Sequence, residues 1–103
     1  SKLTSHSIEC GEVVLNLNDT SVAVRGEKID LTKNEFLILK TLMEKQGKVV
    51  SREEIMERLW GNDEFVDDNT LTVNITRIRK KLEAAGVDDF ITTKRGLGYL
   101  VGV

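Results

Sequence analysis

The segment from Asn69 to Leu82 carries the residues whose types and spacing most clearly indicate a chemical role. It contains four basic residues and no acidic residue. If it is an α-helix, a step of ~100° per residue places Leu71, Ile75, Ile78 and Leu82 in one apolar stripe roughly 60° wide. The opposite side then holds Asn69, Thr70, Val73, Thr76, Arg77 and Lys80. An outward valine among amide, hydroxyl and guanidinium groups is the kind of surface that reads a DNA major groove, where methyl groups contact thymine and donors contact base edges.

A second basic group lies near the C-terminus, in a segment that reads as a β-hairpin over residues 90–102. Ile91–Thr93 and Tyr99–Val101 are the expected strands, and Lys94 to Gly98 is the expected turn. Lys94 and Arg95 stand beside two glycines, which permit close approach to a phosphate backbone or a narrow groove. A long basic helix followed by a basic-tipped hairpin predicts a helix-turn-helix with a wing.

Each of these signals has a structural alternative when taken alone. Single exposed valines are common on protein surfaces, and basic helix faces are usually only solvated. The weight of the prediction therefore rests on the combination of the helix with the hairpin.

The elements that must position these residues can be read from hydrophobic periodicity. Residues 7–31 alternate apolar and polar positions, which predicts about four short antiparallel strands, of which Ile8–Cys10 is the weakest. Leu15 shares a face with Leu17, and Val22 shares one with Val24. Turn residues at 18–20 and at 25–26 separate the strands. The expected fold class is α+β, a winged helix-turn-helix preceded by a four-stranded antiparallel sheet.

Three helices are expected between the sheet and the hairpin. Thr32 and Glu35 form a capping box that starts a helix over 32–46, which stops before Gly47. A second capping box at 51–54 starts a helix over 51–60. Asp67 or Asp68 can cap the third helix, expected over about 69–85 and ending at Gly86. The connection over 61–68 is longer than a simple helix-turn-helix requires, which indicates a role of its own.

Composition is compatible with one globular domain but does not by itself favour nucleic acid. The chain has 103 residues, 40% hydrophobic and 31% charged, with 15 basic and 17 acidic residues and a net charge of -2. The charges are unevenly distributed, since residues 1–68 hold 9 basic and 14 acidic residues, whereas residues 69–103 hold 6 and 3. The net charge therefore confines any DNA binding to one face and does not exclude it.

Several function classes are disfavoured by the residues. No apolar run approaches the roughly 18 residues needed to span a bilayer, and no signal peptide opens the chain, so a cytoplasmic protein without membrane contact is expected. Cys10 has no partner for a disulfide, and Cys10 with His6 cannot make a four-ligand zinc site. No third residue orients a catalytic base, so neither an enzyme nor a cofactor is expected.

The ordered motifs of the chain resemble the winged-helix effector domain of OmpR/PhoB-type response regulators. The matching segments are Leu31-Thr32-x-x-Glu35-Phe36-x-x-Leu39, Gly47-x-Val49-Val50-Ser51-Arg52-Glu53, Leu59-Trp60-Gly61, Arg77-Ile78-Arg79-Lys80-Lys81-Leu82 and Thr93-Lys94-Arg95-Gly96-x-Gly98-Tyr99. They extend in order from residue 31 to residue 99. The resemblance implies a domain that binds promoter half-sites as a dimer or in tandem, with an upstream receiver domain absent from this chain and a cognate histidine kinase.

The resemblance also implies roles for individual residues. Those facing DNA from the recognition helix would be Asn69, Thr70, Val73, Asn74, Thr76, Arg77, Lys80 and Lys81, and those of the wing would be Thr93, Lys94, Arg95 and Gly96. Backbone contacts would come from Arg52, Trp60, Arg79 and Tyr99, although Trp60 and Tyr99 are equally suited to capping the core. The loop over 61–68, with Asn62, Asp63, Glu64 and Phe65, resembles the family's loop that contacts RNA polymerase; a polar connector is its structural alternative.

One departure from the common pattern refines the resemblance. Many members carry Arg where this chain has Asn69 and an acid where it has Thr72, so Asn69 brings no charge to a phosphate. The run from Asp67 to Arg77 is similar to the branch that responds to bacitracin and other cell-envelope-acting peptides (BceR or GraR type), which implies control of antibiotic-resistance genes. A winged-helix module that binds another protein and not DNA is the alternative function, because the fold alone does not fix the function.

Overall fold

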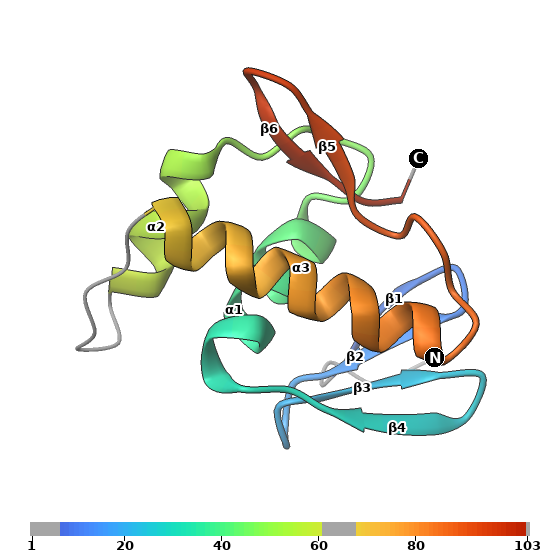
Figure 1. The fold of residues 1–103 in the computed structure, drawn as a ribbon. Helices are drawn as coiled ribbons and strands as arrows, with labels where there is room; N and C mark the ends of the chain where they lie inside the picture. Colours follow the sequence, from blue (N-terminus) through green and yellow to red (C-terminus); the bar gives the residue numbers. More distant parts are fainter. Residues whose placement is uncertain (1–6, 61–67, 103) are drawn as a thin grey trace.

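The structure, a computed structural model, describes residues 7–60 and 68–102. Within them the chain forms, in order, β1 (Ser7–Cys10), β2 (Val13–Asn16), β3 (Ser21–Val24), β4 (Glu27–Asp30), α1 (Lys33–Glu44), α2 (Arg52–Trp60), α3 (Asp68–Ala84), β5 (Thr92–Lys94) and β6 (Gly98–Leu100). Figure 1 shows α3 crossing the molecule between the four-stranded sheet and the β5–β6 hairpin, with α1 behind it. The expected α+β winged-helix arrangement is confirmed.

The N-terminal sheet has the order β1-β2-β3-β4, and each neighbouring pair is antiparallel. Its register places Ile8, Leu15, Val22 and Ile29 opposite one another in a row that crosses all four strands. Leu15 and Val22 in this row are fully buried. Alternation in the sequence therefore predicted both the strands and the face that packs inward.

Helix α1 begins at the predicted capping box and ends earlier than expected. The Glu35 amide donates to the Thr32 hydroxyl at 3.2 Å, and the Thr32 amide donates to Glu35 Oε1 at 3.0 Å. The helix ends at Glu44 and not at residue 46. The reason is a tertiary contact, because Gly47, at a φ of +86°, donates its amide to the Val101 carbonyl at 2.7 Å.

The Glu35 carboxylate is buried, with 1% of the residue exposed. Besides closing the capping box, Oε1 accepts a hydrogen bond from Lys81 Nζ of α3 at 2.6 Å. The same ammonium donates to the Asp30 carbonyl at the end of β4, at 3.0 Å. Lys81 and Glu35 therefore tie the sheet, α1 and α3 together, which the sequence did not predict.

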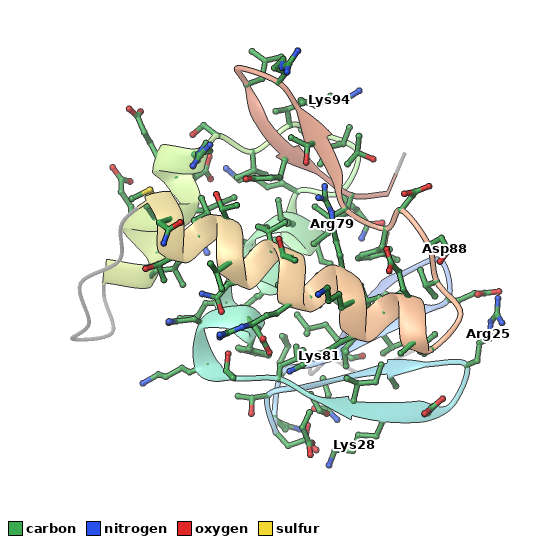
Figure 2. All side chains as sticks on the ribbon, in the orientation of Figure 1. Arg25, Lys28, Arg79, Lys81, Asp88 and Lys94 are labelled. Carbon is green, nitrogen blue, oxygen red and sulfur yellow. The ribbon has the colours of Figure 1, made fainter. Side chains whose placement is uncertain are left out.

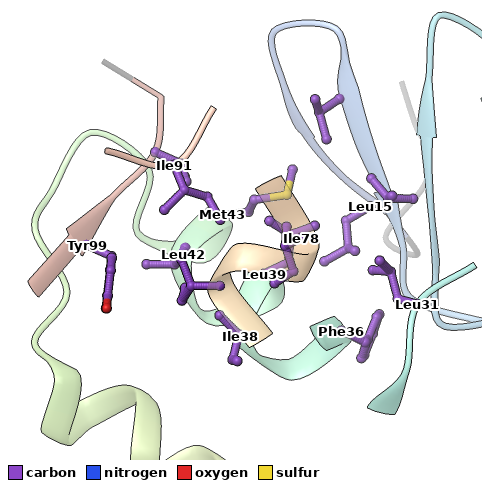
Figure 3. Packing of buried hydrophobic residues seen from close by; sticks show 14 of the residues in the cluster. Leu15, Leu31, Phe36, Ile38, Leu39, Leu42, Met43, Ile78, Ile91 and Tyr99 are labelled. Carbon is purple, nitrogen blue, oxygen red and sulfur yellow. The ribbon is translucent and has the colours of Figure 1, made fainter. Parts of the chain in front are cut away.

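The core lies where the sheet, the three helices and the base of the hairpin meet (Figure 3). Its fully buried side chains are Leu15, Ile38, Leu39, Leu42, Met43, Ile55, Leu59, Leu71, Ile75, Ile78, Leu82 and Ile91. Each large aliphatic side chain buried in this way contributes about 1.5–3 kcal/mol to folding. Among the described helices, none has both the length and the apolar character to cross a membrane.

We expect Glu35→Gln to lower the free energy of unfolding by about 1–3 kcal/mol, because the variant leaves the Lys81 ammonium without its buried counter-charge. Urea titration followed by circular dichroism measures this change. The matched control is Glu44→Gln on the same helix, whose exposed pairs with Arg58 and Lys40 should contribute no more than about 0.5 kcal/mol. Equal stability of the two variants would contradict a structural role for the buried pair.

Candidate nucleic-acid interface

Helix α3 covers Asp68–Ala84, one residue ahead of the expected 69–85 at both ends. It terminates as predicted at Gly86, which has a φ of +98°. The Val87 amide donates to the Leu82 carbonyl at 2.9 Å, a hydrogen bond typical of a glycine-terminated helix. The predicted apolar stripe of Leu71, Ile75, Ile78 and Leu82 is buried, which fixes the rotation of the helix about its axis.

The opposite face of α3 is open to solvent as the periodicity predicted. Asn69, Thr76, Arg77 and Lys80 are exposed, and Thr70 is half-buried. Val73 is 38% exposed, an unusual position for a branched apolar residue on a helix that already has a buried stripe. A shallow groove runs from this face to the start of α1, lined by Thr32, Asn34, Asn69, Thr70, Val73, Asn74 and Arg77.

Three other predicted contact residues of α3 point toward the rest of the fold. Asn74 is 5% exposed, and its Nδ2 donates to the Thr70 carbonyl at 2.9 Å. Lys81 bonds to Glu35 and Asp30 as described above. Arg79 lies on the other flank of the helix, toward the hairpin (Figure 2). The motif resemblance implies DNA contacts for these three residues, whereas the helix periodicity places them beside the buried stripe.

The β5–β6 hairpin forms the predicted wing, with β5 displaced by one residue from the expected strand. Thr92–Lys94 pairs antiparallel with Gly98–Leu100, and the Leu97 amide closes the turn by donating to the Lys94 carbonyl at 2.8 Å. Thr93, Lys94, Arg95 and Gly96 are all exposed. Leu97 at the tip is 64% exposed. The hairpin therefore holds two cations and one apolar side chain away from the core.

The base of the wing is fixed against the segment before α2. Tyr99 is 6% exposed, and its amide and carbonyl exchange hydrogen bonds with Val50 at 3.0 and 2.8 Å. Gly98 lies so close that a Cβ there would be 2.0 Å from the Val50 carbonyl oxygen. Only glycine permits this approach. The contact brings Ser51 and Arg52, at the start of α2, to one wall of a groove shared with wing residues 93–99.

The charges of the interface differ from those of the sheet. In the sheet, Asp19 accepts a hydrogen bond from Ser21 at 2.6 Å and pairs with Lys28 at 3.1 Å; both contacts lower the pKa of the Asp19 carboxyl group. Arg25 pairs with Glu12 at 2.7 Å. On the outer face of α3 and on the wing, Arg77, Lys80, Lys94 and Arg95 have no carboxylate within ion-pair distance among residues 7–60 and 68–102. These cations are available to an external anion.

Two predicted parts of the site lie outside what the structure describes. Helix α2 ends at Trp60, but the side chain of that residue lies outside what the structure describes. The predicted polymerase-contact residues Asn62, Asp63, Glu64 and Phe65 also lie outside the described residues.

Comparison with known proteins agrees with this arrangement. Residues 26–101 match the family described as "Transcriptional regulatory protein, C terminal". The chain is 54% identical over 91 residues to the sensory transduction protein BceR of Bacillus subtilis (strain 168), covering 88% of this chain but 39% of BceR. It thus spans about two fifths of that relative's length.

Two solved structures share the fold. The C-terminal domain of the nisin resistance regulator NsrR, a lantibiotic response regulator, superimposes with a TM-score of 0.79 at 39% identity, covering 91% of this chain and 94% of that one. The Klebsiella pneumoniae RstA DNA-binding domain, in complex with the RstA box, gives a TM-score of 0.77 at 29% identity, covering 93% and 96%.

The match covers the strand β4, all three helices and the wing, and the relatives include the BceR type that the sequence motifs indicated. The chain therefore belongs to the C-terminal domains of transcriptional regulatory proteins of the OmpR/PhoB type.

Proposed function

We propose that this domain binds double-stranded promoter DNA sequence-specifically and thereby regulates transcription as the effector part of a two-component response regulator. The observation that carries the proposal is the outer surface of α3, where Val73, Arg77 and Lys80 are exposed opposite a fully buried stripe. A helix held in this way can enter the major groove as a rigid body. The wing beside it carries further cations at its tip, suited to a neighbouring minor groove or backbone.

Each exposed residue has a distinct task in this mechanism. The Arg77 guanidinium can donate two parallel hydrogen bonds to guanine O6 and N7, and the methyl groups of Val73 can contact a thymine methyl group. Asn69 and Thr76 offer neutral donors and acceptors along the same face. Lys80 and the wing residues supply charge to the phosphates, which positions the helix without reading sequence.

The relatives support both the proposed DNA binding and the proposed class of target genes. The RstA domain is a DNA-binding domain in complex with its box, and NsrR is a regulator of nisin resistance. With BceR as a further relative, we infer that the targets of this domain are cell-envelope or peptide-antibiotic resistance genes. Such a role places the protein in the bacterial cytoplasm. It also implies a receiver domain, a cognate histidine kinase, paired binding on DNA and a contact of the 61–68 loop with RNA polymerase.

We expect Arg77→Ala to weaken binding to the operator by about 1–3 kcal/mol and to relax base preference at the position it reads. The operator is first selected from a pool of random duplexes, and affinity is then measured by fluorescence anisotropy. Val73→Ala should reduce the preference for thymine at its own position. Lys28→Ala on β4 is the control, because Lys28 lies on the sheet and is paired with Asp19. Unchanged affinity and base preference in the Arg77 and Val73 variants would show that α3 is not the reading helix.

Binding should weaken steeply with salt, because each phosphate contact releases counter-ions. We expect the slope of log K against log salt concentration to become shallower by ~1 in Arg95→Ala, which removes one such contact. Titrations between about 50 and 200 mM KCl measure the slope. A slope near zero for the unmodified chain would exclude a phosphate interface. The protein-binding alternative predicts a different outcome, namely that no duplex is selected at all.

A further inference from the structure

We propose that Arg79 is a positioning residue that locks the wing to the recognition helix. The lock keeps the DNA-facing surface of the wing in a fixed position relative to that of the helix. The inference rests on the proposed function, since it describes how one DNA-binding surface is kept rigid. It assigns to Arg79 a task within the protein, whereas the motif resemblance implied a contact with the DNA backbone.

The contacts of the Arg79 guanidinium define the lock. Its Nε and Nη2 both donate to the Ile91 carbonyl, at 3.2 and 2.9 Å, and Nη2 also donates to Thr93 Oγ1 at 2.5 Å. Ile91 is 2% exposed and directly precedes β5, in which Thr93 is the central residue. One planar group therefore holds two neighbouring points of the first wing strand. The fork of an arginine fits such a pair of acceptors, whereas a single ammonium does not hold the same fixed geometry.

The position of Arg79 on α3 makes this lock relevant to recognition. At ~100° per residue, Arg77 and Arg79 point about 160° apart around the helix axis. Arg77 is exposed to solvent. Arg79 reaches the wing (Figure 2). Between them, Ile78 is fully buried in the core. If the wing moves relative to Arg79, it therefore also moves relative to Arg77 and the outward face of α3.

Among the described residues, hydrogen bonds from outside the hairpin reach both sides of the wing, whose base is also buried in the core. On β6, Tyr99 is bonded to Val50 ahead of α2. On the other side, Arg79 holds Ile91, just ahead of β5, and Thr93 within β5. A hairpin fixed along one strand can still rotate about that strand, whereas fixing both strands removes this freedom. The connection from α3 to β5 is a seven-residue segment over 85–91 with left-handed residues at Gly86 and Asp89. The buried Ile91 side chain anchors its end, and the Arg79 guanidinium fixes the backbone there and the Thr93 side chain beyond it.

The experiment measures coupling between Arg79 and Arg95 at the wing tip. Operator affinity is determined by anisotropy for Arg79→Lys, Arg79→Met and Arg95→Ala, and for the double variants. In the otherwise unmodified chain, we expect Arg95→Ala to weaken operator binding by about tenfold or more. In either Arg79 background the same change should weaken binding by less than about threefold, because a wing that is no longer fixed does not present Arg95 to the DNA. Arg79→Lys should bind as weakly as Arg79→Met. Arg77→Ala should weaken operator binding by the same factor in the unmodified chain and in both Arg79 variants.

The opposite pattern would overturn the proposal. If Arg79→Lys restores normal affinity and Arg95→Ala remains fully costly in both Arg79 backgrounds, Arg79 is a phosphate contact and not a lock. If an Arg79 variant does not fold, Thr93→Val tests the same contact from the other side. It removes one acceptor at nearly constant shape, and it should reduce the cost of Arg95→Ala in the same direction; an undiminished cost would count against the lock.

A measurement without DNA separates this proposal from the proposed function. In the free protein, Arg79→Lys should accelerate amide hydrogen exchange at Leu97 and Tyr99, whose hydrogen bonds close and anchor the wing, while amides of α1 keep their rates. If no duplex is selected but this acceleration is seen, the DNA function fails and the lock stands. If DNA is bound but wing exchange is unchanged, the lock fails and the DNA function stands.

Discussion

Burial of one stripe of α3 is the constraint on which the rest of the interface depends. Once Leu71, Ile75, Ile78 and Leu82 are in the core, the direction of every other side chain on the helix is set. Val73 and Arg77 must face solvent, and the residues beside the stripe must contact the elements that pack against α3. The reading face is therefore a consequence of core packing, and it is as rigid as the core itself.

The two flanks of that stripe are occupied by cations that bond within the protein. On one side Lys81 reaches the buried Glu35 and the Asp30 carbonyl, so the sheet and α1 are fixed to α3. On the other side Arg79 reaches the strand β5. Three of the bonds end on backbone carbonyls, whose positions change little unless the fold changes. The basic character of the helix thus has two parts, one that faces outward and one that bonds within the protein.

The sequence predicted most of the fold because its signals are local. The capping box at Thr32 and Glu35, the glycine that ends α3 and the alternation in β2 and β3 depend on neighbours within a few residues. What it missed is tertiary. The early end of α1 follows from the bond between Gly47 and Val101, and the contacts of Arg79 and Lys81 are made with partners 12 to 51 residues away. Asn74 is a local case, because its amide group bonds to the Thr70 carbonyl one turn earlier in the same helix. The motif resemblance grouped these three with the contact residues, although their helical angles already placed them beside the core.

The acidic total of the chain has a consequence for how the interface meets DNA. Carboxylates on the sheet, α1 and α2 pair with nearby cations, as Glu12 does with Arg25 and Glu44 with Arg58, so these surfaces offer a phosphate backbone little attraction. The cations of α3 and the wing keep their charge. The domain is thus a dipole that approaches a duplex with one face, which favours correct docking over sliding on other surfaces. The same cations account for the expected salt dependence of binding, because they are the charges that this face brings to the phosphates.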